Sequence, residues 1–147
     1  MPNAKNLFTE EQRQTIVSAI KEAENQTSGE IRVHIENTVK EEPLDRAVAL
    51  FYKLDMNKTE LRNGVLIYLA VEDRQLAIIG DKGINEVVED GFWDHIKDEM
   101  IRHFKDGQFT EGLAKGILMA GEALQAHFPY QQDDKNELSD DISFKDD

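Results

Sequence analysis

The sequence contains no cysteine, which excludes disulfides, thiolate nucleophiles and cysteine-based zinc or iron–sulfur sites. It also has no apolar run near the roughly 18–20 residues that a membrane-spanning helix requires. The first residues, Met1 to Phe8, lack the apolar stretch of a secretory signal peptide. From these absences we expect a protein of the cytoplasm that does not span a membrane.

Basic residues are scarce, because 17 Lys and Arg stand against 30 Asp and Glu and the net charge is −13. Nucleic acid and anionic membranes repel such a chain, so neither is expected as a partner. Divalent cations are the natural counterparts of this charge, and we expect a monomer. The 147 residues are enough for one domain with a sizeable core.

Hydrophobic periodicity predicts an alternation of helices and short strands. The predicted elements are a helix over 10–25, a strand over 30–35, a helix from Pro43 to Leu54, strands over 64–70 and 75–80, and helices over 90–107 and 110–128. This order is typical of a three-layer α/β/α sandwich around a small mixed central sheet. We assign it to residues 1–128 and expect residues 129–147 to form a disordered acidic tail.

Helix ends are predicted from residues that satisfy the free backbone groups there. Thr9 and Gln12 have the spacing of a capping box for the first helix. Asp90 and Thr110 are the predicted N-caps of the last two helices, and Gly107 is the predicted stop between them.

Burial follows from the same patterns. Residues 30–35 alternate between polar and apolar, which predicts a half-buried strand, whereas the continuously apolar 64–70 predicts a central strand covered on both faces. The predicted buried stripe of the second helix consists of Leu44, Val48, Phe51 and Leu54.

The main chemical feature is a group of carboxylates that begins where the last predicted strand ends. Five of them fall within fourteen residues, namely Asp81, Glu86, Glu89, Asp90 and Asp94. Loops at strand ends often carry function, and carboxylates held together repel one another unless protons, water or a cation compensate their charge. The cluster therefore indicates a binding site.

The predicted topology brings more oxygen donors to the same place. A helix that crosses over between strands 30–35 and 64–70 makes these strands parallel, and the following hairpin makes strand 75–80 antiparallel. The start of the first strand, the start of the second and the end of the third then share one sheet edge. Glu30, Asn63 and Asp81 are expected to meet there.

Oxygen donors without sulfur favour a hard cation, so Ca²⁺ is the predicted ligand, with Mg²⁺ or Mn²⁺ as weaker candidates. Six carboxylates exceed the needs of one ion, so one or two ions are expected. The spacing does not match an EF-hand loop, because Gly83 and Phe92 occupy two of the required ligand positions. The alternative is a solvated acidic loop in which Asp90 is only a helix cap.

Five segments together resemble the TPM domain family over residues 8–128. They are Thr27 to Val33, Arg62 to Ala70, Arg74 to Ile84, Asp94 to Ile96 and Phe104 to Leu113. The chain resembles a stand-alone soluble form of this domain. The resemblance implies an α/β/α sandwich, a divalent-metal site and an acid-phosphatase activity. The metal ligands that it implies are Glu30, Asp81, Asp90 and Asp94, with Glu89 and Asn63 as further candidates.

Three functional hypotheses follow. The first is a Ca²⁺-type binding module in which the ion orders the acidic loop and regulates an interaction. The second is a metal-dependent acid phosphatase of low specificity, with Glu30 or Asp81 as the base and Arg32 or Arg62 holding phosphate. The third is an adaptor in which the metal is purely structural. We expect the binding module, and we assign no residue as catalytic.

Overall fold

The computed structural model describes residues 8–130 and 142–144. The elements in chain order are α1 (Glu10–Glu24), β1 (Glu30–Glu36), α2 (Pro43–Lys53), the 3₁₀ turn η2 (Met56–Lys58), β2 (Gly64–Ala70), β3 (Gln75–Gly80), α3 (Lys82–Asn85), α4 (Asp94–Lys105), α5 (Phe109–Gln125) and β4 (Ser143–Phe144). The predicted order is confirmed, and the sequence pattern missed only the short elements η2, α3 and β4.

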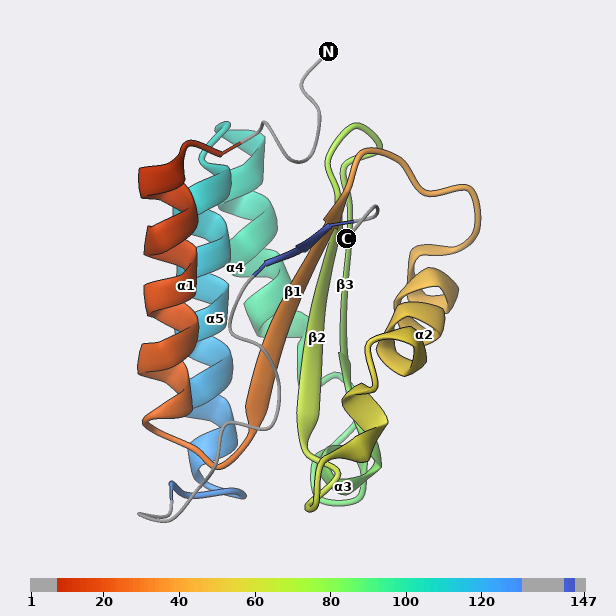
Figure 1. Cartoon of the computed structure of the whole chain (residues 1–147), viewed down its shortest axis with the longest axis vertical. Coiled ribbons are helices and arrows are strands. Elements are labelled where there is room, and N and C mark those ends of the chain that lie inside the picture. Colours follow the sequence, from red (N-terminus) through yellow and green to blue (C-terminus); the bar gives the residue numbers. More distant parts are fainter. Residues whose placement is uncertain (1–7, 131–141, 145–147) are drawn as a thin grey trace.

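The strands form one mixed sheet in the order β3-β2-β1-β4. β1 and β2 are parallel, and β2 and β3 are antiparallel, as predicted. Helices α1, α4 and α5 cover one face of this sheet and α2 covers the other, which confirms the three-layer α/β/α sandwich (Figure 1). None of the helices within the described ranges is long and apolar enough to cross a bilayer.

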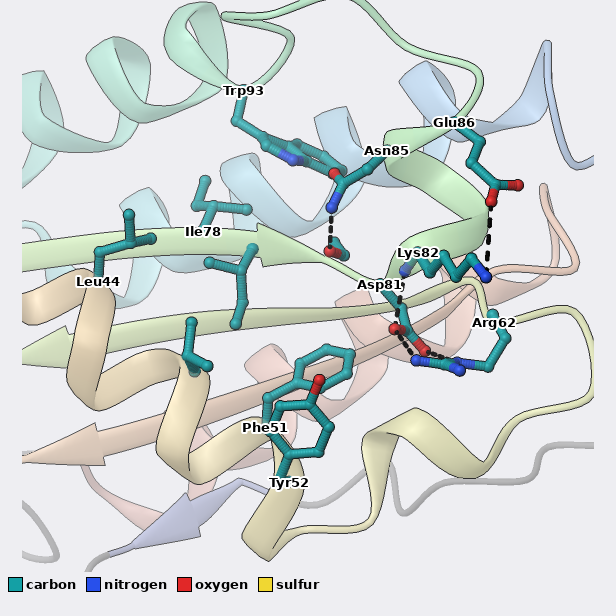
Figure 2. A pocket seen from close by; sticks show the side chains of 13 residues that line it. Leu44, Phe51, Tyr52, Arg62, Ile78, Asp81, Lys82, Asn85, Glu86 and Trp93 are labelled. Carbon is teal, nitrogen blue, oxygen red and sulfur yellow. Dashed lines mark hydrogen bonds and ion pairs between the residues drawn. The ribbon is translucent and has the colours of Figure 1, made fainter.

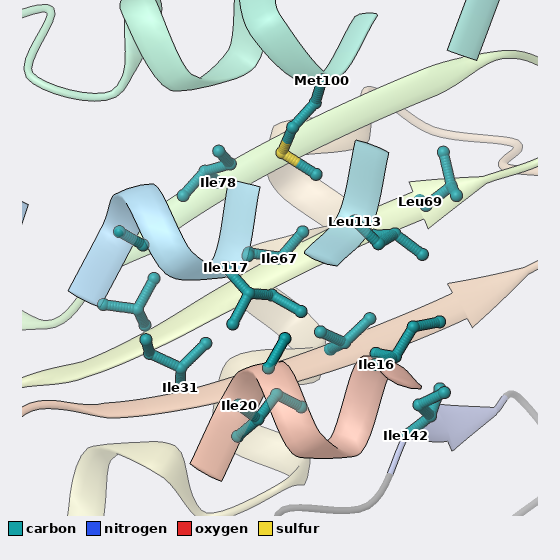
Figure 3. Packing of buried hydrophobic residues seen from close by; sticks show 14 of the residues in the cluster. Ile16, Ile20, Ile31, Ile67, Leu69, Ile78, Met100, Leu113, Ile117 and Ile142 are labelled. Carbon is teal, nitrogen blue, oxygen red and sulfur yellow. The ribbon is translucent and has the colours of Figure 1, made fainter. Parts of the chain in front are cut away.

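Each face of the sheet has its own hydrophobic core because neighbouring side chains on a strand point to opposite faces. On the side of α1, α4 and α5, Ile67 of β2 packs with Ile20 and Ile117 (Figure 3). On the side of α2, Leu66 of β2 packs with Leu50. All residues of β2 are buried, which confirms the prediction of a central strand covered on both faces.

The prediction that β1 is half-buried was wrong. Its polar residues Glu30, His34 and Glu36, which lie on the face of the sheet turned toward α2, are 3%, 2% and 2% exposed. Buried polar groups persist when they are hydrogen-bonded. Partners from α2 and β2 supply these bonds to Glu36, as described below.

The predicted buried stripe of α2 was also partly wrong. Leu44 and Val48 are 56% and 43% exposed, whereas Phe51 is buried as predicted and Ala47 and Leu50 are buried with it. The helix is thus rotated by about one residue from the predicted orientation. This rotation leaves an apolar strip beside β3.

Two of the predicted helix caps are confirmed and two are wrong. Thr9 and Gln12 form the capping box of α1, and Gly107, with φ of 76°, ends α4. Asp90 caps no helix because the chain turns through Gly91 before α4 begins at Asp94. The N-cap of α5 is Gln108, two residues before the predicted Thr110, so Thr110 lies buried in the first turn of the helix.

The acidic tail is not wholly outside the fold. Ser143 and Phe144 pair in parallel with β1 as β4, and Ile142, Ser143 and Phe144 are buried. The guanidinium of Arg13 lies 5.3 Å from the centre of the Phe144 ring. The prediction of disorder is therefore wrong for residues 142–144, while 131–141 and 145–147 lie outside the described residues.

Candidate functional site

The predicted meeting point at the sheet edge is present. Glu30 of β1 lies opposite Gly64 of β2, and the Glu30 N–H donates to the Asn63 carbonyl at 3.3 Å. On the other side of β2, the Asp81 N–H donates to the Gly64 carbonyl at 2.9 Å. Glu30, Asn63 and Asp81 therefore gather at the edge where β1 and β2 begin and β3 ends.

Glu30 and Asp81 also lie on the same face of the sheet. Glu30 aligns with Gly64, two residues before Leu66, and Asp81 continues the alternation of Ala77 and Ile79. Leu66 and Ala77 face α2, so Glu30 and Asp81 lie on that face too. Gly64 lies between the two carboxylates and has no side chain to separate them. With exposures of 3% and 6%, Glu30 and Asp81 form a buried pair of carboxylates on either side of Gly64.

Asp81 has a cationic partner in Arg62. The guanidinium donates from Nε to Oδ2 at 2.7 Å and from Nη2 to Oδ1 at 2.8 Å, a two-point contact shown in Figure 2. The hydrogen bond with Asp81 raises the pKa of Arg62 above its usual value. Asp81 also accepts the Lys82 N–H at 2.7 Å and thereby caps α3.

The backbone of Arg62 adopts a left-handed conformation, with φ of 52°, which is uncommon for a residue other than glycine. The Gly83 N–H holds it by donating to the Arg62 carbonyl at 2.8 Å. A Cβ on Gly83 would lie 2.7 Å from that carbonyl oxygen and closer still to the carbonyl of Leu61. Gly83 is thus required for the close approach of α3 to the segment that carries Arg62.

We expect Gly83→Ala to lower the free energy of unfolding by about 1–3 kcal/mol, because the added methyl group collides with two backbone carbonyls. The Arg62 guanidinium should also become more mobile, which ¹⁵N relaxation at Nε would report. Lys82→Ala, an exposed change in the same helix, is the control and should alter stability by no more than about 0.5 kcal/mol. Equal stability of the two variants in urea unfolding would contradict the prediction.

The remaining predicted ligands, Glu89, Asp90 and Asp94, are exposed and lie in the stretch that leads into α4. The Phe92 ring, 6.2 Å from the His127 ring, holds this stretch near the end of α5. In the part of the chain that the structure describes, no three His, Asp or Glu side chains form a metal-holding group. The structure therefore places the predicted ligands in two sets, one buried at the sheet edge and one exposed.

A groove of about 670 Å³ adjoins the buried set and was not predicted. Its apolar lining comes from α2, β3 and Trp93, and the polar residues at one end are Arg62, Asp81, Lys82, Asn85 and Glu86 (Figure 2). The groove was missed because Leu44 and Val48 were assigned to the buried stripe of α2. Their exposure is set by how the helix is rotated on the sheet, which is a property of tertiary packing.

A second polar cluster lies deep under α2 and was also missed. Glu36 accepts hydrogen bonds from the Tyr68 hydroxyl at 2.6 Å and from Arg46, and its Oε1 lies 3.1 Å from His34 Nε2. The other ring nitrogen of His34 lies 2.9 Å from Ser143 Oγ in β4. Burial acts to raise the pKa of Glu36, but the hydrogen bonds from Arg46, Tyr68 and His34 outweigh it and lower the pKa to about 2.

The fold and site together define a small α/β/α domain with a buried carboxylate pair at one sheet edge. The model of the TPM domain matches residues 3–123, and the chain belongs to the TPM domain family. The family resemblance inferred from the sequence motifs is thereby confirmed. No curated protein matches the chain.

Solved structures show the same fold. The NMR structure of the BA42 protein from the psychrophilic bacterium Bizionia argentinensis is 50% identical, covers 93% of this chain and 94% of its own, and gives a TM-score of 0.88. The N-terminal domain of a P. gingivalis protein is 23% identical over 86% of this chain and 83% of its own, with a TM-score of 0.69. A Corynebacterium glutamicum N-terminal domain is 14% identical over 79% and 73%, with a TM-score of 0.64.

Proposed function

We propose that this TPM domain is a divalent-cation-binding module of the Ca²⁺ type, acting as a monomer in the cytoplasm. The observation that carries the proposal is the buried Asp81 carboxylate, which shares a sheet edge and a sheet face with Glu30. Two carboxylates buried around a glycine attract positive charge strongly because little water screens them. In the structure Arg62 supplies that positive charge to Asp81.

The donor types at this edge fit a hard cation. Ca²⁺ takes six to eight oxygen ligands from carboxylates, amides and carbonyls, and Glu30, Asn63 and Asp81 supply the first two types. The exposed carboxylates of Glu89, Asp90 and Asp94 are the candidates for the remaining positions. A bound ion would offset the mutual repulsion of these carboxylates.

Arg62 gives the site a way to respond to the cation concentration. Binding at Asp81 requires the guanidinium to leave, because it contacts both carboxylate oxygens. Release of Arg62 frees a side chain that lines the groove, and ligation by Asp90 and Asp94 orders the stretch before α4. The cation level would therefore change the surface that the domain presents to a partner.

The test is a titration of metal-free protein with Ca²⁺ and Mg²⁺, followed by amide NMR and melting temperature. Saturable shifts should centre on residues 29–32, 63–64 and 80–95, with Ca²⁺ binding more tightly than Mg²⁺. A ligand that binds only the folded state stabilises it by about 2.7 kcal/mol at a hundredfold excess over Kd, so the melting temperature must rise with the shifts. A phosphomonoester added to the same samples tests the acid-phosphatase alternative, which stays a prediction.

A pair of double variants separates ligation from general charge effects. Asp90→Asn with Asp94→Asn removes two exposed carboxylates from the site, and Glu10→Gln with Glu11→Gln removes two from the first turn of α1. Both pairs change the net charge equally, and we expect only the first to weaken Ca²⁺ binding, by at least about tenfold. Diffuse shifts and equal effects in both pairs would show counterion screening and refute the proposal.

A further inference from the structure

One edge of the central sheet is open. β3 is the last strand in the order β3-β2-β1-β4, and within the described residues no strand pairs with its outer side, although the Asn85 side-chain amide donates to the Gly80 carbonyl at the end of β3 at 3.1 Å. Its sequence, Gln75-Leu-Ala-Ile-Ile-Gly80, has no charge and no proline. Exposed edge strands are normally protected by charged side chains, proline or bulges, because their free N–H and C=O groups can pair with another chain. β3 has neither charged side chains nor proline to protect its edge.

The groove described above follows that edge. Ile78 and Ile79 both line it, although neighbouring side chains on a strand point to opposite faces of the sheet. Because the groove contacts both side chains, it must open at the outer edge of β3, where the two faces of the sheet meet. α2 forms one wall and Trp93 the other (Figure 2).

The α2 wall presents apolar surface to solvent. Leu44, Val48 and Tyr52 line the groove with exposures of 56%, 43% and 57%. A six-residue strand such as β3 is about 20 Å long, enough to template an added strand of similar length. An added strand would place alternate side chains against this wall and against Trp93.

Charge determines the kind of strand that fits. The charged residues lining the groove balance, because Arg62 and Lys82 stand against Asp81 and Glu86, while the whole chain has a net charge of −13. An apolar segment can therefore enter a groove whose lining has no net charge. Its flanks then face the acidic surface outside, where basic residues are favoured.

We propose that the free edge of β3 binds an extended segment of a partner protein by strand addition, with alternating apolar residues in the segment and basic residues at its flanks. The backbone of β3 supplies the hydrogen bonds and the groove receives the apolar side chains. A second copy of the chain fits less well, because two bodies that each have a net charge of −13 repel. The proposal does not depend on cation binding, so it is tested in EDTA.

The probe is a ten-residue peptide with three Val-Thr repeats between pairs of lysines. Added to metal-free protein, it should shift the amides of residues 75–80 and of α2 around Val48, and saturate below about 1 mM. A peptide with three Gly-Ser repeats between the same lysines measures attraction by charge alone and should not saturate. Shifts spread over the acidic surface, alike for both peptides, would overturn the proposal.

N-methylation identifies pairing through the backbone. Alternate N–H groups of an extended peptide point to opposite edges, so methylation of the three valine amides or of the three threonine amides blocks one edge only. We expect one of these two peptides to lose binding and the other to keep it. Retention of binding by both, or its loss in both, would overturn strand addition.

A matched pair of protein variants locates the site. Val48→Lys places a charge on the groove wall, and Ile101→Lys places the same charge at a 37% exposed position of α4 outside the groove lining. The first should weaken peptide binding at least tenfold and the second should leave it unchanged. Equal weakening of peptide binding by the two variants would show that the peptide does not bind in the groove. NMR diffusion tests whether the protein dimerises as its concentration rises. Dimerisation that Val48→Lys abolishes would show that the groove binds a second copy of the chain and not a segment of another protein.

Discussion

Replacement of Glu36 by alanine is expected to lower the free energy of unfolding by about 3–5 kcal/mol, because it breaks a buried ion pair by removing one partner. Glu36 is 2% exposed and accepts hydrogen bonds from Arg46 and Tyr68, with His34 also in contact. In the variant the Tyr68 hydroxyl and the His34 ring stay buried without their acceptor. Burial without a hydrogen bond destabilises each of these groups.

Urea unfolding at pH 7 measures this loss, and Lys58→Ala is the control. Lys58 also forms an ion pair, with Asp55, but the two side chains are 70% and 65% exposed. An exposed pair contributes at most about 1 kcal/mol, so this control should unfold nearly as the parent protein does. Similar losses in the two variants would show that the cluster under α2 does not hold the fold together.

The same cluster makes the protein sensitive to acid. The pKa of Glu36 is lowered from its ordinary value of 4.5 to about 2, so its stabilising effect is complete above pH 4.5 and is lost as the pH falls toward 2. Burial lowers the pKa of His34 below 6.5, so the folded state favours the neutral ring. The stability that comes from this neutral ring is also lost as the pH falls below 6.5. In Glu36→Gln the free energy of unfolding should fall less steeply between pH 4.5 and 3. An unchanged slope would contradict this assignment.

The fold was predictable because local pattern and topology agree. The apolar run of β2 and the amphipathic helices on either side of it leave few arrangements other than a layered sandwich. The parallel and antiparallel pairings followed from the crossover helix α2 and from the tight turn between β2 and β3. The meeting of Glu30, Asn63 and Asp81 then followed from topology alone.

The errors come from features that only tertiary packing decides. The alternation in β1 predicted exposed polar residues, yet Glu36 is buried with hydrogen bonds from Arg46 and Tyr68, and His34 is buried between Glu36 and Ser143. The pairing of β4 with β1 brings Ser143 against His34, 109 residues apart, and the acidic composition of the tail gives no signal of this contact. Asp90 has the right residue type for a cap but not the right backbone, because Gly91 turns the chain after it.

The site was predictable as a location but not as an arrangement. Sequence spacing grouped the carboxylates between Asp81 and Asp94, topology added Glu30, and all of them were expected to converge at one site. The structure buries Glu30 and Asp81 and leaves Glu89, Asp90 and Asp94 exposed. The role of Arg62 as the partner of Asp81 depends on its left-handed backbone and on the close approach of α3, which the sequence alone does not reveal.

Replacement of Arg62 by glutamine is expected to have two effects of opposite sign. Without Ca²⁺ the protein should become less stable, because the nearly buried Asp81 carboxylate loses its cationic partner. The affinity for Ca²⁺ should rise by at least about tenfold, because no guanidinium then has to leave Asp81 before the ion binds. Urea unfolding in EDTA and calorimetric titration with Ca²⁺ measure the two effects on the same sample.

Arg74→Gln is the matched control, because Arg74 also has a left-handed backbone, with φ of 54°, and is exposed. Both changes remove one positive charge, and Arg74 lies in the turn between β2 and β3, at the end of β3 away from Asp81, so the control reports the effect of net charge without a guanidinium at the site. A gain in Arg62→Gln that clearly exceeds the control therefore reports the local effect of the guanidinium that contacts Asp81. If Arg62→Gln destabilises the protein without any gain in affinity, the ion pair between Arg62 and Asp81 is structural, and the proposed cation site at the sheet edge is wrong.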